Sequence, residues 1–275
     1  MGSTIVIPET ARRIEASRAD RWARYRDLVV INAFRSLKVR YRGSFLGIYW
    51  SLSNPLLMTL VYTAIFGSAF SAYYGSILNY VLACFAGLAF LNFFSGATSM
   101  ALPTIVGNGG LLNKLALPPS IFPVSTVAAA TFQLLVGVLP LLAIVTLVIS
   151  HNPLNVVALL VPALALVMFS LGFALAVSAL YVYFRDLSYL YELIVFVLWI
   201  TSPIFYPAAL VPAAVRQYLA YNPLAAIIEC VRQIALSGVR PSFHLMGAAM
   251  LDATIVLAVG VLIYASVRDG FMDLI

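Results

Sequence analysis

Charged residues are scarce in this chain. Asp, Glu, Lys and Arg make up 9% of its 275 residues, and none of them occurs between residues 43 and 113. Soluble domains carry roughly 25% charged residues, whereas 63% of this sequence is hydrophobic. The composition therefore excludes an ordinary soluble protein and predicts an all-α integral membrane protein.

The charge that is present is concentrated near the start. Ten of the 16 Lys and Arg residues lie between Arg12 and Arg42. A net charge of +6 is compatible with nucleic-acid binding, but basic residues next to an apolar run are typical of a cytoplasmic segment facing anionic lipid. We therefore expect no nucleic-acid partner. We expect residues 1–42 to be cytoplasmic, with an amphipathic helix over residues 10–37 in the plane of the membrane interface.

The remaining residues, 43–275, predict a transmembrane domain. A bilayer core of about 30 Å needs roughly 20 apolar residues per helix. The six spans that we predict are 46–70, 78–101, 120–149, 155–183, 189–206 and 246–267. With the N-terminus inside, six spans return the C-terminus to the cytoplasm. Residues 203–244 hold several prolines and apolar stretches too short to cross, which predicts a re-entrant helical hairpin on the outer side.

Patterns for catalysis, metal binding and ion coupling are also missing. No phosphate-loop motif occurs, so nucleotide hydrolysis would need a separate subunit. The histidines and cysteines are isolated, which predicts no metal site and buried, unpaired thiols at Cys84 and Cys230. Asp252, near the outer end of the last span, is the ionisable residue that we expect within the membrane. It either pairs with Arg240 or lines a pore.

Several sequence blocks point to a known family. They are RYRGSFLGIYWSLSNPLL (40–57), NGGLLNKLALPPSIFP (108–123), VYFRDLSYL (182–190), SPIFYP (202–207) and YNPLAAIIECVR (221–232). In this order they resemble the membrane subunits of ABC-2 type polysaccharide exporters, the O-antigen, teichoic acid and capsule permeases. The resemblance implies the ABC-2 fold of a type V exporter and a homodimer of six-span subunits in a bacterial inner or plasma membrane.

The same resemblance implies how the work is divided between subunits. Two separate ATP-binding cassette subunits would hold ATP and Mg, and this chain would be a permease without a cofactor. Its cargo would be a polyprenyl-pyrophosphate-linked polysaccharide, O-antigen-like or cell-wall galactan-like.

The family's ATPase engages the N-terminal helix and a cytoplasmic coupling helix between spans two and three. In this chain the coupling helix would fall at about residues 108–118, with Leu111 to Leu117 helical. The coupling residues that the resemblance implies are Leu111, Leu112, Lys114, Leu115, Arg185 and Asp186. The alternatives are a loop packed under its own subunit and, for the last two residues, an intramolecular charge pair.

Two groups of residues are candidates for substrate contact. Arg40 and Arg42 lie where the chain enters the membrane, and guanidinium groups match phosphate oxygens; ordinary anchoring on the cytoplasmic side is the alternative. Aromatic rings stack on the apolar faces of sugars. The predicted path-lining aromatics are Tyr62, Phe66, Phe70, Phe196, Trp199, Phe205 and Tyr206. The first three are four residues apart and share one helix face. Lipid-facing or helix-packing roles are the alternative.

Two other functions stay open at this stage. The first is an ABC-2 permease for a drug, haem or a small lipid. The second is a membrane-embedded polyprenyl-phosphate enzyme, which the absence of paired carboxylates disfavours. Such an enzyme would turn over lipid-linked sugar without any ATPase.

Overall fold

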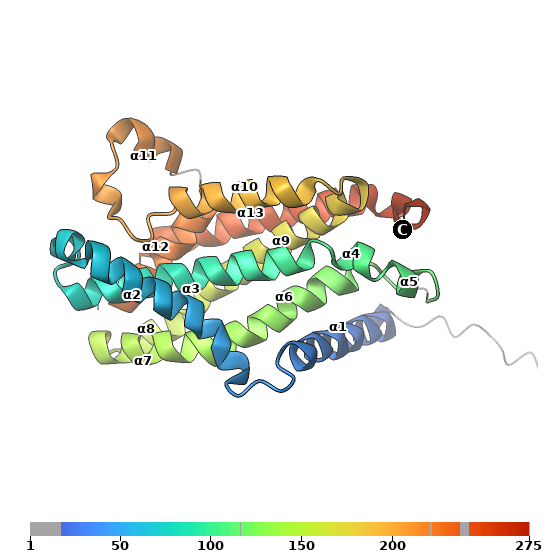
Figure 1. Cartoon of the computed structure of the whole chain (residues 1–275), viewed down its shortest axis with the longest axis horizontal. Helices are drawn as coiled ribbons and strands as arrows, with labels where there is room; N and C mark the ends of the chain where they lie inside the picture. The colour runs from blue at the N-terminus through green and yellow to red at the C-terminus, as the bar shows by residue number, and fades with distance from the viewer. Residues whose placement is uncertain (1–17, 116, 220–221, 237–241, 275) are drawn as a thin grey trace, which may run out of the picture.

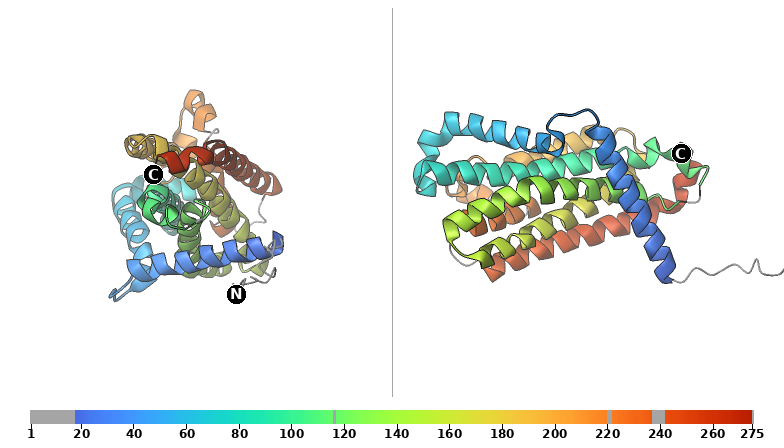
Figure 2. Two further views of the ribbon diagram at one scale, coloured as in Figure 1. Left: turned by 90° about the vertical axis from the view of Figure 1, so that its right-hand side faces the viewer. Right: turned by 90° about the horizontal axis from the view of Figure 1, so that it is seen from below.

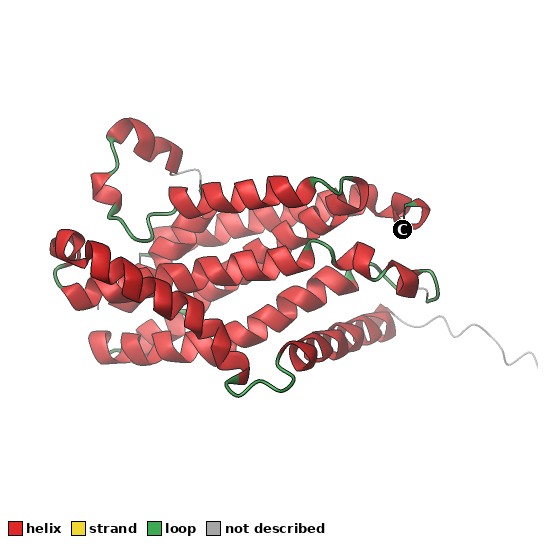
Figure 3. Ribbon diagram, in the orientation of Figure 1, coloured by secondary structure: helices red, strands yellow, loops and turns green. Residues whose placement is uncertain are grey.

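The computed structural model describes residues 18–115, 117–219, 222–236 and 242–274. Within these ranges every regular element is helical (Figure 3). In chain order the elements are α1 (Arg18–Arg40), η1 (Gly47–Tyr49), α2 (Trp50–Phe70), η2 (Ser71–Tyr74), α3 (Ile77–Ala101), α4 (Thr104–Gly107), α5 (Gly109–Leu112), α6 (Ile121–Gln133), η3 (Leu134–Val138), α7 (Leu139–Ser150), α8 (Pro153–Ala158), α9 (Leu160–Tyr183), α10 (Leu187–Thr201), η4 (Ala208–Leu210), α11 (Ala213–Leu219), α12 (Pro223–Leu236), α13 (Phe243–Val267) and η5 (Arg268–Asp273). The predicted all-α class is confirmed.

In the part of the chain that the structure describes, five helical stretches are long and apolar enough to cross a bilayer. They are Gly47–Tyr74, Ile77–Ala101, Ile121–Ser150, Pro153–Tyr183 and Phe243–Met272.

The predicted span 189–206 differs, because α10 ends at Thr201 after 15 residues. At 1.5 Å per residue this helix is about 22 Å long, which is shorter than the hydrocarbon core of about 30 Å. The reason is Pro203, since a proline disfavours helical geometry in the residue before it. Ser202 accordingly adopts an extended conformation, with φ −85° and ψ 121°.

The long helices form a bundle around α3, which packs against α2, α6, α9 and α12 (Figure 1). The most extensive pairing is that of α9 with α13. Gly172 on α9 and Gly260 on α13 face each other there, and the backbone of each helix occupies the space that a Cβ of the other would need. Small residues let membrane helices approach in this way.

Helix α1 crosses the other helices and does not run along them (Figure 2). It packs on α6 through Ala33 and Leu37 against Ala129. The hydroxyls of Tyr25 and Ser120 are hydrogen-bonded at 3.2 Å, and burial raises the pKa of Tyr25 above its ordinary value. The crossing agrees with a helix in the plane of the interface. The helix continues to Arg40, three residues beyond the predicted end, and residues 10–17 lie outside the described part of the chain.

The segment predicted as an outer hairpin contains two helices with different surroundings. Helix α11 stands apart from the bundle (Figure 1), whereas α12 packs against α3, α7, α9 and α13. Most of the apolar side chains of α12 are fully buried. The segment therefore inserts one helix into the bundle core and leaves the other outside it.

The stretch Ile121–Ser150 is not a uniform α-helix. Residues Leu134–Val138 form a π turn, η3, between α6 and α7. A π turn holds one residue more than the α-helical turn it replaces, and such turns occur frequently at functional sites. Gln133 lies immediately before it.

Candidate functional site

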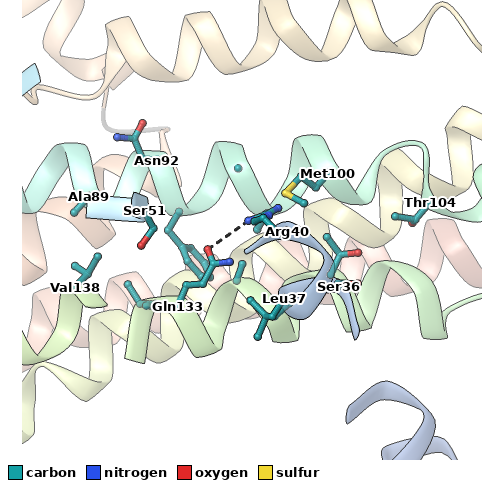
Figure 4. Close-up of a pocket in the computed structure, with 17 residues that line it drawn as sticks. Ser36, Leu37, Arg40, Ser51, Ala89, Asn92, Met100, Thr104, Gln133 and Val138 are labelled. Carbon is teal, nitrogen blue, oxygen red and sulfur yellow. Dashed lines mark hydrogen bonds between the residues drawn. The ribbon is translucent and has the colours of Figure 1, made fainter. Parts of the chain in front are cut away.

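A cavity of about 230 Å³ lies where α1, α2, α3 and α6 meet (Figure 4). Polar side chains of its wall include Arg40 from the end of α1, Ser51 from α2, Asn92 from α3 and Gln133 from the end of α6. The other polar lining residues are Ser36, Thr104 and Thr126. Among the described residues, no Asp or Glu lines it, and the formal charge in its wall is the positive charge of Arg40.

Arg40 and Gln133 are linked across this cavity (Figure 4). The Arg40 Nη1 donates a long hydrogen bond of 3.5 Å to Gln133 Oε1. Gln133 is 9% exposed, and its Nε2 has no hydrogen-bond partner. The Nδ2 of Asn92 is likewise buried without a partner.

The hydroxyls in the wall do not add free donors. The hydroxyls of Ser36, Ser51, Thr104 and Thr126 each donate to a backbone carbonyl, at 2.6–3.0 Å. The unused donors of the cavity therefore belong to Arg40 and the two amides.

The structure separates the two arginines that were predicted to act together. Both arginines are exposed, but Arg40 lines the cavity and Arg42 does not. The chain turns directly after Arg42, where Gly43 has φ +76°, a conformation that glycine adopts without strain. Of the pair, Arg40 alone faces a defined pocket.

The seven predicted path aromatics are brought together around Phe205. Its ring centroid lies 5.0 Å from that of Tyr62 and 5.9 Å from that of Phe66. It also lies 5.6 Å from Trp199 and 5.1 Å from Tyr206. Residues from α2, α10 and the segment after α10 thus share one cluster.

The last two aromatics join at its edges. Phe70 stacks on Phe66 with centroids 5.6 Å apart, and Phe196 stacks on Trp199 at 6.1 Å. We call these seven connected rings the aromatic network.

A groove of about 590 Å³ runs beside the network between α2, α3 and α10. Three rings of the network, Tyr62, Phe196 and Trp199, line it together with Asn92 and Glu192. The other four rings do not. The groove and the Arg40 cavity share Asn92 in their walls, so the two spaces adjoin on α3.

The turn that carries Phe205 is held by a buried arginine. Arg232 on α12 is 6% exposed, and its guanidinium donates to the carbonyls of Ala83, Pro203 and Ile204. No ion pair involving it is found among the described residues. Its charge is therefore stabilised by three backbone carbonyls, two of which follow the C-terminal end of α10.

Asn222 makes a second tie to the same place. Its Oδ1 caps α12 by accepting from the backbone N–H of Leu224 at 3.0 Å. Its Nδ2 donates to Thr201 Oγ1 and Ser202 Oγ at 2.9 and 3.0 Å. Asn222 thus joins the start of α12 to the end of α10.

The predicted coupling helix is shorter and earlier than expected. The helical turn is α5, and the chain leaves it after Leu112. Leu112 is 2% exposed and packs with Ile105 and Phe122, so it is not an exposed contact residue. Leu111 and Leu115, by contrast, are exposed, as is Lys114.

Arg185 and Asp186 lie in the exposed loop between α9 and α10. They are not among the ion pairs of the described residues, which are Arg26–Asp27 and Arg268–Asp269. Arg185 instead sits over the ring of Tyr181, 5.5 Å from its centroid. The ion pairs among the described residues thus include neither Arg185 nor Asp186.

Sequence reasoning missed three polar residues of these sites. Glu192 lies in the predicted span 189–206, so Asp252 is not the sole acidic residue in the predicted spans. Arg240, the predicted partner of Asp252, lies outside the described residues. Gln133 and Asn92 carry no charge and drew no attention within their apolar runs. The available signal was an amide inside a predicted span, because a polar group there needs a partner.

Comparison with known proteins covers nearly the whole chain. A model of the ABC-2 type transporter family matches residues 27–236. Two O-antigen export system permease proteins RfbA from Klebsiella pneumoniae are each 27% identical over 251 residues, covering 90% of this chain and 95% of the relative. A protein of the same name from Myxococcus xanthus is 28% identical over 252 residues with the same coverage.

Proposed function

The chain belongs to the ABC-2 type transporter family, and from that premise we propose that it is the membrane subunit of an ATP-driven exporter of a polyprenyl-pyrophosphate-linked polysaccharide. The proposed class of cargo rests on the similarity to O-antigen export permeases over 90% of the chain. The substrate would pass from the cytoplasmic to the outer side of a bacterial inner or plasma membrane. O-antigen-like and galactan-like polymers both belong to this class.

The aromatic network supports a sugar path. Rings that present their faces to a groove stack on the apolar faces of sugars without deep binding minima, which suits a polymer that must slide. Tyr62, Phe196 and Trp199 line the groove, and Phe205 connects them to the outer end of α10. In this proposal the groove is completed by a second copy of the chain, so that the exporter is a homodimer of six-span subunits.

One end of the bundle supports contact with ATP-binding subunits. The α4–α5 segment, the loop with Arg185 and Asp186, and the C-terminal η5 all lie at the end toward which α1 starts (Figure 1). Leu111, Lys114 and Leu115 are exposed there, and exposed apolar side chains on a short helical turn suit a docking partner. We assign this end, with both termini, to the cytoplasm.

Co-purification with its ATP-binding subunit tests the function. The complex, reconstituted in lipid, should hydrolyse ATP faster with a polyprenyl-pyrophosphate glycan than with the same lipid lacking sugar. Stimulation by a drug, haem or a small lipid alone would contradict the proposed cargo. Turnover of the lipid-linked sugar without ATP would contradict the transporter assignment itself.

Removal of one aromatic ring tests the proposed sugar path. Phe205→Leu keeps an apolar side chain but removes the central ring of the network. We expect slower export of the polymer in the reconstituted complex. Phe243→Leu is the matched control, because Phe243 is 89% exposed on α13 and is not a ring of the network. Equal export by the two variants would refute a path along these rings.

A further inference from the structure

We propose that the cavity between Arg40 and Gln133 is a binding site for a phosphate-type oxyanion, with Gln133 as its second ligand. The site follows from the geometry of the cavity, and only its assignment to a lipid headgroup rests on the proposed function. Gln133 was no candidate from the sequence, and Arg42 is not part of the site.

The orientation of the Gln133 amide is fixed by its neighbour. A guanidinium group only donates hydrogen bonds, so the amide atom that faces Arg40 at 3.5 Å must be the oxygen. The nitrogen therefore points elsewhere, and it has no partner. A buried donor without an acceptor is costly, so the site lacks an acceptor.

The charge in the cavity selects the class of acceptor. No carboxylate lines the wall, and Arg40 makes one long hydrogen bond to a neutral oxygen. The side-chain hydroxyls of Ser36 and Ser51 already donate to backbone carbonyls. A cation would find no negative ligand, and a neutral polyol would gain no charge-assisted hydrogen bond from the guanidinium. An oxyanion satisfies both the charge and the unused amide donor.

The space and position also suit a headgroup. About 230 Å³ is far more than one water molecule needs, and α1, which carries Arg40, lies across the bundle (Figure 2). Asn92 lines both this cavity and the groove beside the aromatic network. A phosphate held by Arg40 would thus lie next to the proposed path of the sugar.

Binding to the purified subunit, without its ATP-binding partner, tests the site. The probes are a polyprenyl phosphate, the uncharged polyprenol of the same length, and inorganic pyrophosphate as a competitor. We expect the polyprenyl phosphate to bind the native protein more tightly than the polyprenol. Arg40→Gln and Gln133→Leu should each weaken this binding about tenfold or more, because each removes a hydrogen bond to a charged group. Arg42→Gln is the matched control and should bind like the native protein.

Thermal unfolding of the unliganded variants distinguishes a ligand role from a structural one. Gln133→Leu should unfold at the native temperature or above it, since it removes an unpartnered buried donor. If pyrophosphate displaces the polyprenyl phosphate, the site accepts a soluble anion as its occupant. If it does not, the site accepts the phosphate only as part of a lipid headgroup. Native-like binding by Gln133→Leu, or equal binding of polyprenol, would overturn the proposal. Because no transport is measured, a failure of export would leave this result unaffected.

Discussion

Replacing Gly172 with alanine tests how closely α9 and α13 depend on contact between their backbones. A Cβ on Gly172 would lie 2.5 Å from both the Leu257 Cα and the Val256 carbonyl oxygen, whereas ordinary contact begins at 3.4 Å. The helices would have to separate by roughly 0.9 Å at this point, the difference between those distances. A gap of that size forfeits about a quarter to a half of the dispersion attraction across it.

Gly247→Ala is the matched control on α13. A Cβ there meets nothing within 4 Å, so this variant has the gain in helix propensity without the clash. That gain is about 1 kcal/mol and is common to both variants. The difference between them is therefore the cost of overpacking, about 1–3 kcal/mol.

The assay is thermal unfolding in one detergent, followed by tryptophan fluorescence. At roughly 2–4 °C per kcal/mol, Gly172→Ala should unfold several degrees below Gly247→Ala. Equal midpoints, or a higher midpoint for Gly172→Ala, would refute the close approach of the two helices.

Three further predictions concern Arg232 on α12 and Leu111 and Leu112 on α5. Arg232→Met should lower the unfolding temperature in the same assay, because three backbone carbonyls lose a charged donor and each unsatisfied buried group costs about 1–3 kcal/mol. Arg232→Lys should lower the unfolding temperature less. Equal losses of stability by the two variants would contradict the three-carbonyl contact. Leu112→Asp should unfold the end of the bundle that holds α4 and α5, since Leu112 is 2% exposed and an unpaired buried charge is strongly destabilising. Leu111→Asp should keep the native unfolding temperature but reduce co-purification with the ATP-binding subunit, and undiminished co-purification would contradict a coupling role for this turn.

Much of the fold follows from composition and spacing. Long uncharged stretches predict the five membrane-length helices because a bilayer imposes a minimum length. The four-residue spacing of Tyr62, Phe66 and Phe70 predicts one aromatic face on α2, and the structure confirms their stacking. Both inferences concern neighbours along one helix, where local geometry decides the outcome.

The parts that could not be predicted depend on contacts between distant segments. The sequence does not predict the burial of Arg232, which depends on α12 bringing it to the carbonyls after α10. Gln133 looked like an ordinary residue of an apolar span, and its role depends on Arg40, 93 residues away. A single sequence does not show which residues far apart in the chain contact one another.

The π turn at Leu134–Val138 has a consequence for the helix phase of this span. The turn holds one residue more than the α-helical turn it replaces, so deletion of one residue within η3 would let the stretch close as a regular helix. Helix α7 would then keep nearly its present rotation relative to Gln133, and the face that now packs against α12 would still meet it. A one-residue deletion elsewhere in α6 or α7 would instead rotate all later residues of the stretch by about 100°, so a sequence alignment should place a one-residue gap within this turn.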